Sequence, residues 1–209
     1  MDQLNVSGSM SAIHIKNTPQ LGSRDSSQLQ LVYDTTYKEG VWLHDAGSVQ
    51  FPNLTSTDIV TAIDTNAEFP RLGTVSTELY VTNPNMGHTS FRSLAKASTF
   101  CFGNASVGSD SVLGYPRSTD LVVQQSMVIG PMSDGSDSKQ PPVNIVNGNL
   151  ELNQLAKVGE DLNITGNRGI VGFSFERLGD VNRLNIMDNP NSTISLNFPR
   201  LTSAKFNLD

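Results

Sequence analysis

Two groups of acidic residues have the side chains needed for acid–base chemistry on a polysaccharide. The first is Asp58, Asp64 and Glu68, and the second is Glu160, Asp161, Asp180 and Asp188. Such chemistry needs two or three carboxyl groups, often with a basic side chain, converging on one groove. Glu160 and Asp180 occupy similar turn positions in adjacent coils, so these two carboxylates are expected to lie within reach of each other. No basic residue recurs beside either group, and we therefore favour a solvated rim of polar turn residues over an enzyme site.

Metal, cofactor and thiol chemistry find less support. The histidines His14, His44 and His88 have no partner at ligand spacing. No phosphate-binding, dinucleotide-binding or nucleophile-elbow motif is present, so no cofactor is expected. Cys101, the single cysteine, lies between Phe100 and Phe102. It is predicted to be buried or half-buried in a strand, either as inert packing or paired with something outside the chain.

Trp42 is the one aromatic residue that suggests a binding role. It lies between Val41 and Leu43, so in a strand it points to the opposite side from both. An outward tryptophan can stack on a sugar ring. The alternative is that the N-terminal segment covers it.

A repeated phrase indicates the elements that position these residues. The phrase is an aromatic residue or Leu, then a Leu three residues later, a polar turn, and an apolar-x-apolar pair often followed by Asn. Copies begin at Phe51, Phe69, Phe91, Leu152, Phe175 and Phe198. The expected apolar pairs are Ile13/Ile15, Leu29/Leu31, Val41/Leu43, Thr61/Ile63, Leu79/Val81, Phe100/Phe102, Leu121/Val123, Val143/Ile145, Leu162/Ile164, Leu184/Ile186 and Phe206/Leu208.

The spacing of these pairs predicts an all-β fold, a right-handed parallel β-helix or solenoid with coils of about 18–23 residues. An apolar-x-apolar pair is a strand with one face inward, and stacking the coils joins the inward side chains into columns. The second apolar pair, such as Phe175 and Leu178, is expected to line another wall of the same core. The whole chain, residues 1–209, is predicted to be one domain whose ends are truncated within a coil.

Asparagines and one loop complete the predicted coil. Asparagines expected at one turn are Asn17, Asn83, Asn104, Asn147, Asn167 and Asn189. Asn tolerates left-handed backbone angles and its amide bonds neighbouring backbone, so a structural role is favoured over ligand contact. Residues 130–142, rich in Gly, Ser, Asp and Pro, are predicted to be a mobile loop insertion, with a binding role as the alternative.

Net charge excludes one class of partner. The formal charge is −6 and Lys and Arg form no cluster, so nucleic-acid binding is not expected. No apolar run approaches the roughly 18–20 residues that span a bilayer.

The repeated phrase resembles a known family. Its motifs are Phe51-Pro52-Asn53-Leu54, Phe69-Pro70-Arg71-Leu72, Asn83-Pro84, Asn189-Pro190 and Phe198-Pro199-Arg200-Leu201. They resemble the leucine-rich β-helix of receptor L-domains, and most closely fungal GPI-anchored cell-wall proteins of the Ecm33/Sps2 type. The resemblance implies a secreted, N-glycosylated protein of the cell wall or outer face of the plasma membrane, held there by a C-terminal lipid anchor whose signal, like a signal peptide, this chain does not contain.

Acceptor triplets for N-linked glycans occur at Asn5, Asn53, Asn104, Asn163 and Asn191. The leading hypothesis is therefore a non-catalytic extracellular cell-surface glycoprotein that supports fungal cell-wall organisation and integrity, with wall polysaccharide or surface proteins as partners. One alternative is a receptor L-domain-like module that binds a peptide, protein or glycan on its broad sheet. The other is a wall-polysaccharide hydrolase or lyase.

Overall fold

The computed structural model describes residues 12–17, 29–30, 36–37, 39–82, 91–103, 120–130, 144–190 and 196–208, and the regular structure in these ranges is β-strand. The larger sheet contains β1 (Ala12–Lys16), β2 (Leu29–Gln30), β3 (Thr36–Tyr37), β4 (Gly40–Gln50), β5 (Ser56–Glu68), β6 (Thr74–Thr82), β7 (Lys96–Gly103), β8 (Leu121–Val123), β9 (Met127–Ile129), β11 (Leu155–Thr165), β13 (Asp180–Met187) and β15 (Ser203–Leu208). The smaller sheet contains β10 (Asn144–Glu151), β12 (Asn167–Ser174) and β14 (Leu196–Asn197).

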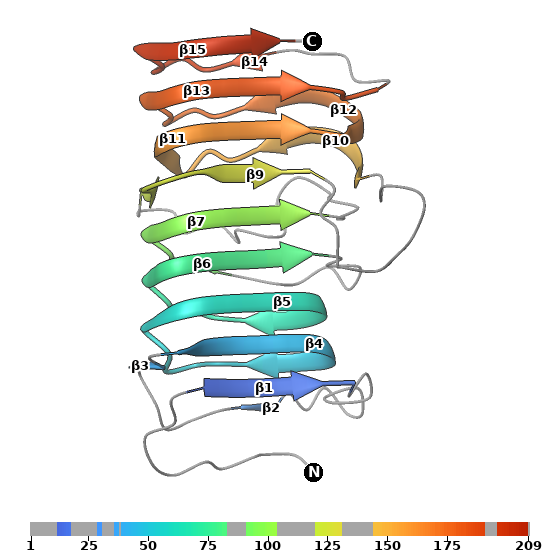
Figure 1. Cartoon of the computed structure of the whole chain (residues 1–209), viewed down its shortest axis with the longest axis vertical. Coiled ribbons are helices and arrows are strands. Elements are labelled where there is room, and N and C mark those ends of the chain that lie inside the picture. The colour runs from blue at the N-terminus through green and yellow to red at the C-terminus, as the bar shows by residue number, and fades with distance from the viewer. Residues whose placement is uncertain are drawn as a thin grey trace.

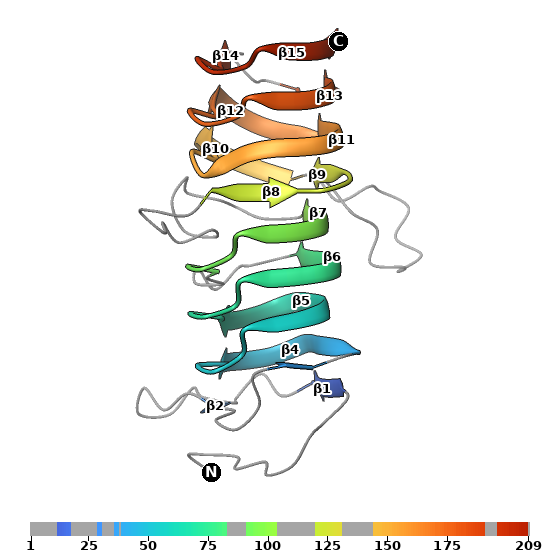
Figure 2. The same cartoon turned by 90° about the vertical axis from the view of Figure 1, so that its left-hand side faces the viewer.

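The strands stack as the rungs of a parallel β-solenoid, which confirms the predicted fold class. Every strand pair is parallel, and the main path of the larger sheet runs β1-β4-β5-β6-β7-β8-β11-β13-β15. Figure 1 shows these strands one above another from β1 to β15, and Figure 2 shows the smaller sheet as a second wall beside β11, β13 and β15. Most side-chain hydrogen bonds between adjacent coils join residues 18 to 23 positions apart, as the repeat predicts.

The core is a set of apolar columns that run along the stack. In the C-terminal part, Leu162 pairs with Leu184 and Leu184 pairs with Phe206, as predicted. In the N-terminal part, Leu79 pairs with Phe100 and Val81 pairs with Phe102. Apart from Phe206 in the last described coil, the side chains of these residues are at most 5% exposed, so each coil buries the apolar face of the next one.

In β5 the predicted apolar pair is wrong by one residue. Val60 and Ala62 are buried and pair with Val41 and Leu43, whereas Thr61 and Ile63 are only half-buried. The corner decides this register, because the residue two positions before each left-handed corner residue points inward. Ala62 precedes Asp64 by two positions in the same way that Leu43 precedes Asp45. Shifting a strand by one residue would move all its side chains to the opposite face.

The middle of the stack also departs from the predicted schedule. Met127 and Ile129 of β9, not Leu121 and Val123, continue the column of Phe100 and Phe102. Leu121 and Val123 are buried earlier in the same coil, where Val123 pairs with Ala97. Two apolar-x-apolar pairs in one long coil cannot be ranked by spacing alone. Ile145 pairs with Arg168 in the smaller sheet, and Val143 and Leu31 lie outside the described residues.

The aromatic phrase forms a tight corner that repeats along the stack. In four copies the backbone N–H of the Leu donates to the carbonyl of the aromatic residue three positions earlier. The rings stack between coils: the ring centroid of Phe69 lies 4.8 Å from that of Phe51 and 5.0 Å from that of Phe91, with nearly parallel planes. Phe175 and Leu178 are fully buried, which confirms that this phrase lines a second wall of the core.

The opposite corner is a column of left-handed residues, but asparagine does not occupy most of it. Positive φ angles occur at Asn17 (54°), Asp45 (49°), Asp64 (48°), Gly166 (66°) and Asp188 (52°). Asn167 and Asn189 come directly after such residues, and their amides bond backbone carbonyls, as the structural prediction requires. Asn147 was expected at this turn but lies inside β10, and Asn83 and Asn104 lie outside the described residues.

Two further expectations from the sequence concern the loop at 130–142 and a membrane-spanning segment. The predicted loop at 130–142 lies outside the described residues except for Gly130, which is buried at the end of β9. Within the described ranges, no helix has the length and apolar character needed to cross a bilayer.

Candidate functional site

The residue between the two apolar residues of each coil points away from the core, and together these residues form one line on the outer face of the larger sheet. We call this line the outer column. Consecutive members are partners in the strand register. The outer column consists of His14, Trp42, Thr61, Tyr80, Cys101, Val128, Asn163, Asn185 and Asn207.

The N-terminal part of the outer column is aromatic. Trp42 is half-buried and points away from the buried Val41 and Leu43, as its position predicts. The imidazole of His14 stacks on its indole with ring centroids 4.4 Å apart and planes 3° from parallel. One face of the indole is therefore covered by a side chain of β1. Tyr80 lies two rungs further along, about 10 Å away, with Thr61 between.

The C-terminal part of the outer column is a ladder of amides. Asn185 Nδ2 donates to Asn163 Oδ1 at 2.6 Å, and Asn185 in turn is the register partner of Asn207. In the neighbouring column, Arg183 makes a bidentate pair with Asp161 through distances of 2.9 and 3.0 Å. The outer face therefore changes from aromatic at one end to polar at the other.

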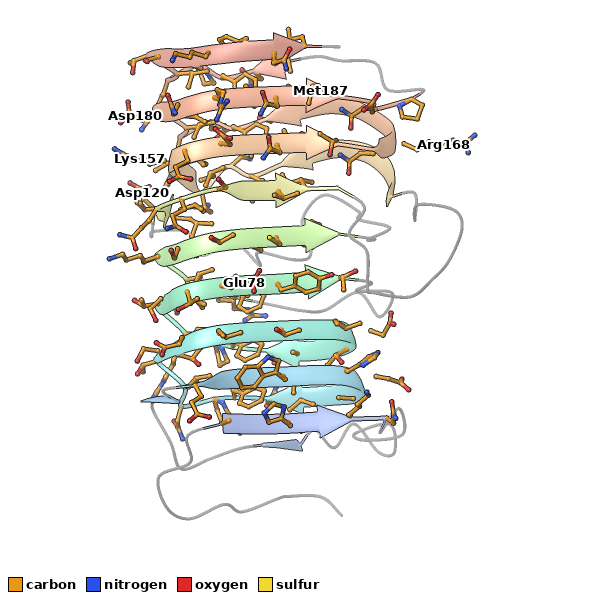
Figure 3. All side chains as sticks on the ribbon, viewed as in Figure 1. Glu78, Asp120, Lys157, Arg168, Asp180 and Met187 are labelled. Atoms are coloured by element: carbon orange, nitrogen blue, oxygen red, sulfur yellow. The ribbon has the colours of Figure 1, made fainter. Side chains whose placement is uncertain are left out.

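Cys101 lies in the middle of the outer column, between Tyr80 and Val128. It is a free thiol and only 7% exposed, so the prediction of a buried or half-buried strand residue is confirmed. Burial, followed by the nearby charge of Glu78, raises the pKa of the thiol to about 11. Figure 3 shows Glu78 on the same outer face. The thiol is therefore protonated at neutral pH, which is the state expected of inert packing.

The first acidic group is spread around β5. Asp58 accepts a hydrogen bond from the Ser76 hydroxyl, in the coil on one side. Glu68 accepts from Gln50 Nε2 at 2.5 Å, in the coil on the other side. Asp64 is the left-handed corner residue between them. Each carboxylate thus serves a different place in the coil.

The second acidic group does not bring Glu160 close to Asp180, so this prediction is wrong. Asp180 is the register partner of Lys157 and forms an ion pair with it at 3.8 Å. Figure 3 shows these two residues one above the other on one edge of the stack. Glu160 lies three residues beyond Lys157 and accepts from Ser126 at 3.4 Å. The irregularity in register between Val158 and Asp161 separates positions that look equivalent in sequence.

The remaining members of this group are also used between coils or at corners. Asp161 pairs with Arg183, and Asp188 occupies the left-handed corner. No group of three or more metal-ligating side chains occurs among the residues that the structure describes. His44 is exposed on β4, and His88 lies outside the described ranges.

Two of the five predicted glycan acceptors can be placed. Asn53 is half-buried in the corner after Phe51, and its Oδ1 lies 3.5 Å from Arg71 Nη1. Asn163 is half-buried on the outer face, within β11, as predicted. Asn5, Asn104 and Asn191 lie outside the described residues.

Comparisons with protein-family models, with curated proteins and with solved structures give no match for this chain. A hypothesis about its function therefore depends on the geometry of the outer face and on the repeated phrase.

The stacking of His14 on Trp42, and the place of Tyr80 in the same line, were missed from the sequence. A simple signal was available, because each residue lies in the middle of an apolar-x-apolar pair. Reading those middle residues from coil to coil gives most of the outer column, although the predicted pair Leu121/Val123 would have supplied Val122 in place of Val128. The error of one residue in β5 would still have replaced Thr61 with Ala62.

Proposed function

We propose that this protein is a non-catalytic extracellular cell-surface glycoprotein that supports the organisation and integrity of a fungal cell wall. Its solenoid holds N-linked glycans and polar side chains along an elongated surface, and a C-terminal lipid anchor attaches it to the membrane. Wall polysaccharide and other surface proteins are its partners. The proposal follows the resemblance of the repeated Phe-x-x-Leu phrase to fungal wall proteins.

The observation that carries the non-catalytic part is how the acidic residues are used. Asp161 forms a bidentate ion pair with Arg183. Asp180 forms an ion pair with Lys157, and Asp120 forms one with Arg177 at 2.6 Å. These contacts join one coil to another along the stack. A catalytic pair would instead converge on a bond held between the two carboxyl groups.

Complementation in the organism that encodes the chain tests this function. Deletion of the gene is expected to increase sensitivity to wall-perturbing dyes. A variant with both Glu160→Gln and Asp180→Asn should restore resistance fully, since neither carboxylate does chemistry. A Phe69→Ser variant, which damages the core, should not. Loss of rescue by the carboxylate variant at normal abundance would instead indicate catalysis.

Glycan mapping tests the secretory part separately. Material secreted by a fungal host should lose mass on treatment with a glycosidase that removes N-linked glycans. Asn53, in a corner, should be occupied more fully than Asn163, which lies inside a strand that is paired on both sides. Site occupancy is read from tryptic peptides, and unmodified protein would contradict the proposal.

A ligand-binding module of the receptor L-domain kind is the second candidate, favoured by the aromatic part of the outer column. Trp42 is the single tryptophan, so its fluorescence reports on this surface without interference. Titration with soluble β-glucan or chitin oligosaccharides should shift the emission, and Tyr80→Ala should weaken the response. An unchanged spectrum at saturating oligosaccharide would remove glycan binding at this face.

A further inference from the structure

Apolar side chains flank the N-terminal part of the outer column on the same face of the larger sheet. In β5, Ile59 and Ile63 lie two positions before and two positions after Thr61, so all three point outward. Trp42 and Tyr80 lie on the rungs on either side of Thr61. All five side chains are half-buried, and each therefore leaves part of its surface to solvent. We call these five residues the platform.

The indole of Trp42 is held in place by its neighbours. The imidazole of His14 stacks on one face of the ring. A Cβ atom on Gly40 would lie 2.9 Å from Trp42 Cη2 and 2.9 Å from Ile59 Cβ, so the absence of a side chain there lets the far edge of the indole lie against the backbone. A ring that is already fixed loses little conformational freedom when a ligand binds, which favours affinity.

We propose that the platform binds one extended chain of β-1,4-linked N-acetylglucosamine, laid along the stack. This inference rests on the proposed wall function and names the polysaccharide. The sugar rings of such a chain follow one another at nearly the spacing of neighbouring strands, about 4.8 Å. Successive rings are turned over, so every second ring presents the same face. Trp42 and Tyr80 are two rungs apart and meet the same face of sugars n and n + 2, while the small Thr61 leaves room for the sugar between them.

The two isoleucines of the platform select the acetamido group. In an extended β-1,4-linked chain, the substituents on carbon 2 of successive sugars point to opposite edges of the ribbon. Ile59 and Ile63 lie on opposite sides of Thr61 along β5. An acetamido methyl group can pack on an isoleucine side chain, whereas the hydroxyl of a glucose chain would lose water there without gaining a partner. A chain of the chitin type is therefore preferred to one of the cellulose type.

The straight line of rungs also selects the linkage. A β-1,3-linked chain winds into a helix, so its successive rings leave a straight row of side chains after a few sugars. The five platform residues are uncharged, which suits a neutral polymer. The platform should therefore discriminate both between linkages and between substituents on carbon 2.

Fluorescence of the single tryptophan in the 209-residue chain measures binding. The N-acetylglucosamine hexamer should shift the emission at concentrations at which the β-1,4-linked and β-1,3-linked glucose hexamers do not. Tyr80→Ala should weaken the affinity by about tenfold, a loss typical of a truncated aromatic anchor, and Tyr80→Phe should restore it. Ile63→Ser should bring the affinity for the N-acetylglucosamine hexamer toward that for the β-1,4-linked glucose hexamer. The control Asn185→Ala, on the outer face away from the platform, should bind normally.

A second variant blocks the platform without removing any of its aromatic rings. Thr61→Arg fills the space between Trp42 and Tyr80, and it should abolish binding while the circular dichroism spectrum stays that of the parent protein. Equal affinity for the N-acetylglucosamine hexamer and either glucose hexamer would overturn the inference. Binding that neither Tyr80→Ala nor Thr61→Arg weakens would overturn it too.

The binding assay and the complementation assay fail independently. No emission shift with the N-acetylglucosamine hexamer at the limit of its solubility would overturn the inference, and a chain that still restored dye resistance would keep the proposed wall function without this partner. Normal, linkage-selective binding by a chain that fails to restore resistance would contradict the wall function and leave the platform as a glycan-binding surface.

Discussion

Asn189 holds Asn167 through two hydrogen bonds to one oxygen: Asn189 Oδ1 accepts from both the backbone N–H and Nδ2 of Asn167, each at 3.0 Å. Asn167 Nδ2 also donates to the carbonyls of Ile129 and Thr165, and the side chain is fully buried. The two asparagines thus tie three successive coils together at the corner. Their amides donate to backbone carbonyls at the corner, in their own coil and in the neighbouring one.

Asn167→Ala is expected to lower the free energy of unfolding by about 2 kcal/mol or more, because it removes the hydrogen bonds that a fully buried amide makes to three neighbouring groups. Urea denaturation followed by circular dichroism measures the loss. The control Asn185→Ala removes an amide from the outer face, where water replaces the lost hydrogen bond, and should cost about 1 kcal/mol or less. Equal losses would show that the corner has no special role.

The stacked phenylalanine rings of the corner predict that removing a ring costs more free energy of unfolding inside the stack than near its last described coil. Phe69 is fully buried between Phe51 and Phe91, so Phe69→Ala should cost about 3–5 kcal/mol. Phe198 is half-buried and has one stacked neighbour, Phe175, at 5.1 Å. Phe198→Ala should therefore cost clearly less. Chemical denaturation of both variants compares them, and a larger loss at Phe198 would contradict the ladder.

Gly159 in β11 allows its backbone to lie close to the backbone of the neighbouring coil. A Cβ atom on Gly159 would lie 1.9 Å from the carbonyl oxygen of Gln124, so Gly159→Ala forces backbone to move. We expect it to destabilise the fold by more than about 2 kcal/mol, within the range of overpacking. Gly73→Ala is the matched control, since its nearest atom would lie at 3.7 Å. Thermal unfolding should show a large drop for the first variant and little change for the second.

Cys101 predicts a specific pH dependence. Its pKa is raised from 9.0 to about 11, first by burial and then by Glu78. Between these values the unfolded chain loses the thiol proton and the folded protein keeps it, so folding stability falls as the pH rises through this window. The full loss is about 3 kcal/mol, because the shift is about two pH units and each unit corresponds to about 1.4 kcal/mol.

Urea titrations at pH 8 and pH 11 measure this loss. The Cys101→Ala variant is the control, and it should show a smaller decrease than the parent protein over the same range. A parent and variant with the same pH dependence would show that the thiol titrates normally in the folded state.

The sequence by itself determined the architecture. Apolar-x-apolar pairs and the Phe-x-x-Leu corner encode a strand and a turn within a few residues, and their recurrence requires stacking, because no coil can bury its own face. The burial of Cys101, the outward direction of Trp42 and the register of Leu162, Leu184 and Phe206 follow from the same local alternation.

Tertiary structure decided what depends on the exact length of each coil. In β5 the spacing predicted Thr61 and Ile63, but the inward pair is Val60 and Ala62, which is in phase with the left-handed corner at Asp64. In the long central coil, Met127 and Ile129 occupy the inward positions that continue the column of Phe100 and Phe102. In β11, an irregularity in the strand register separates Glu160 from Asp180. The outer column arises only when residues about 20 positions apart become neighbours, because side chains meet across rungs and register is a property of the stack.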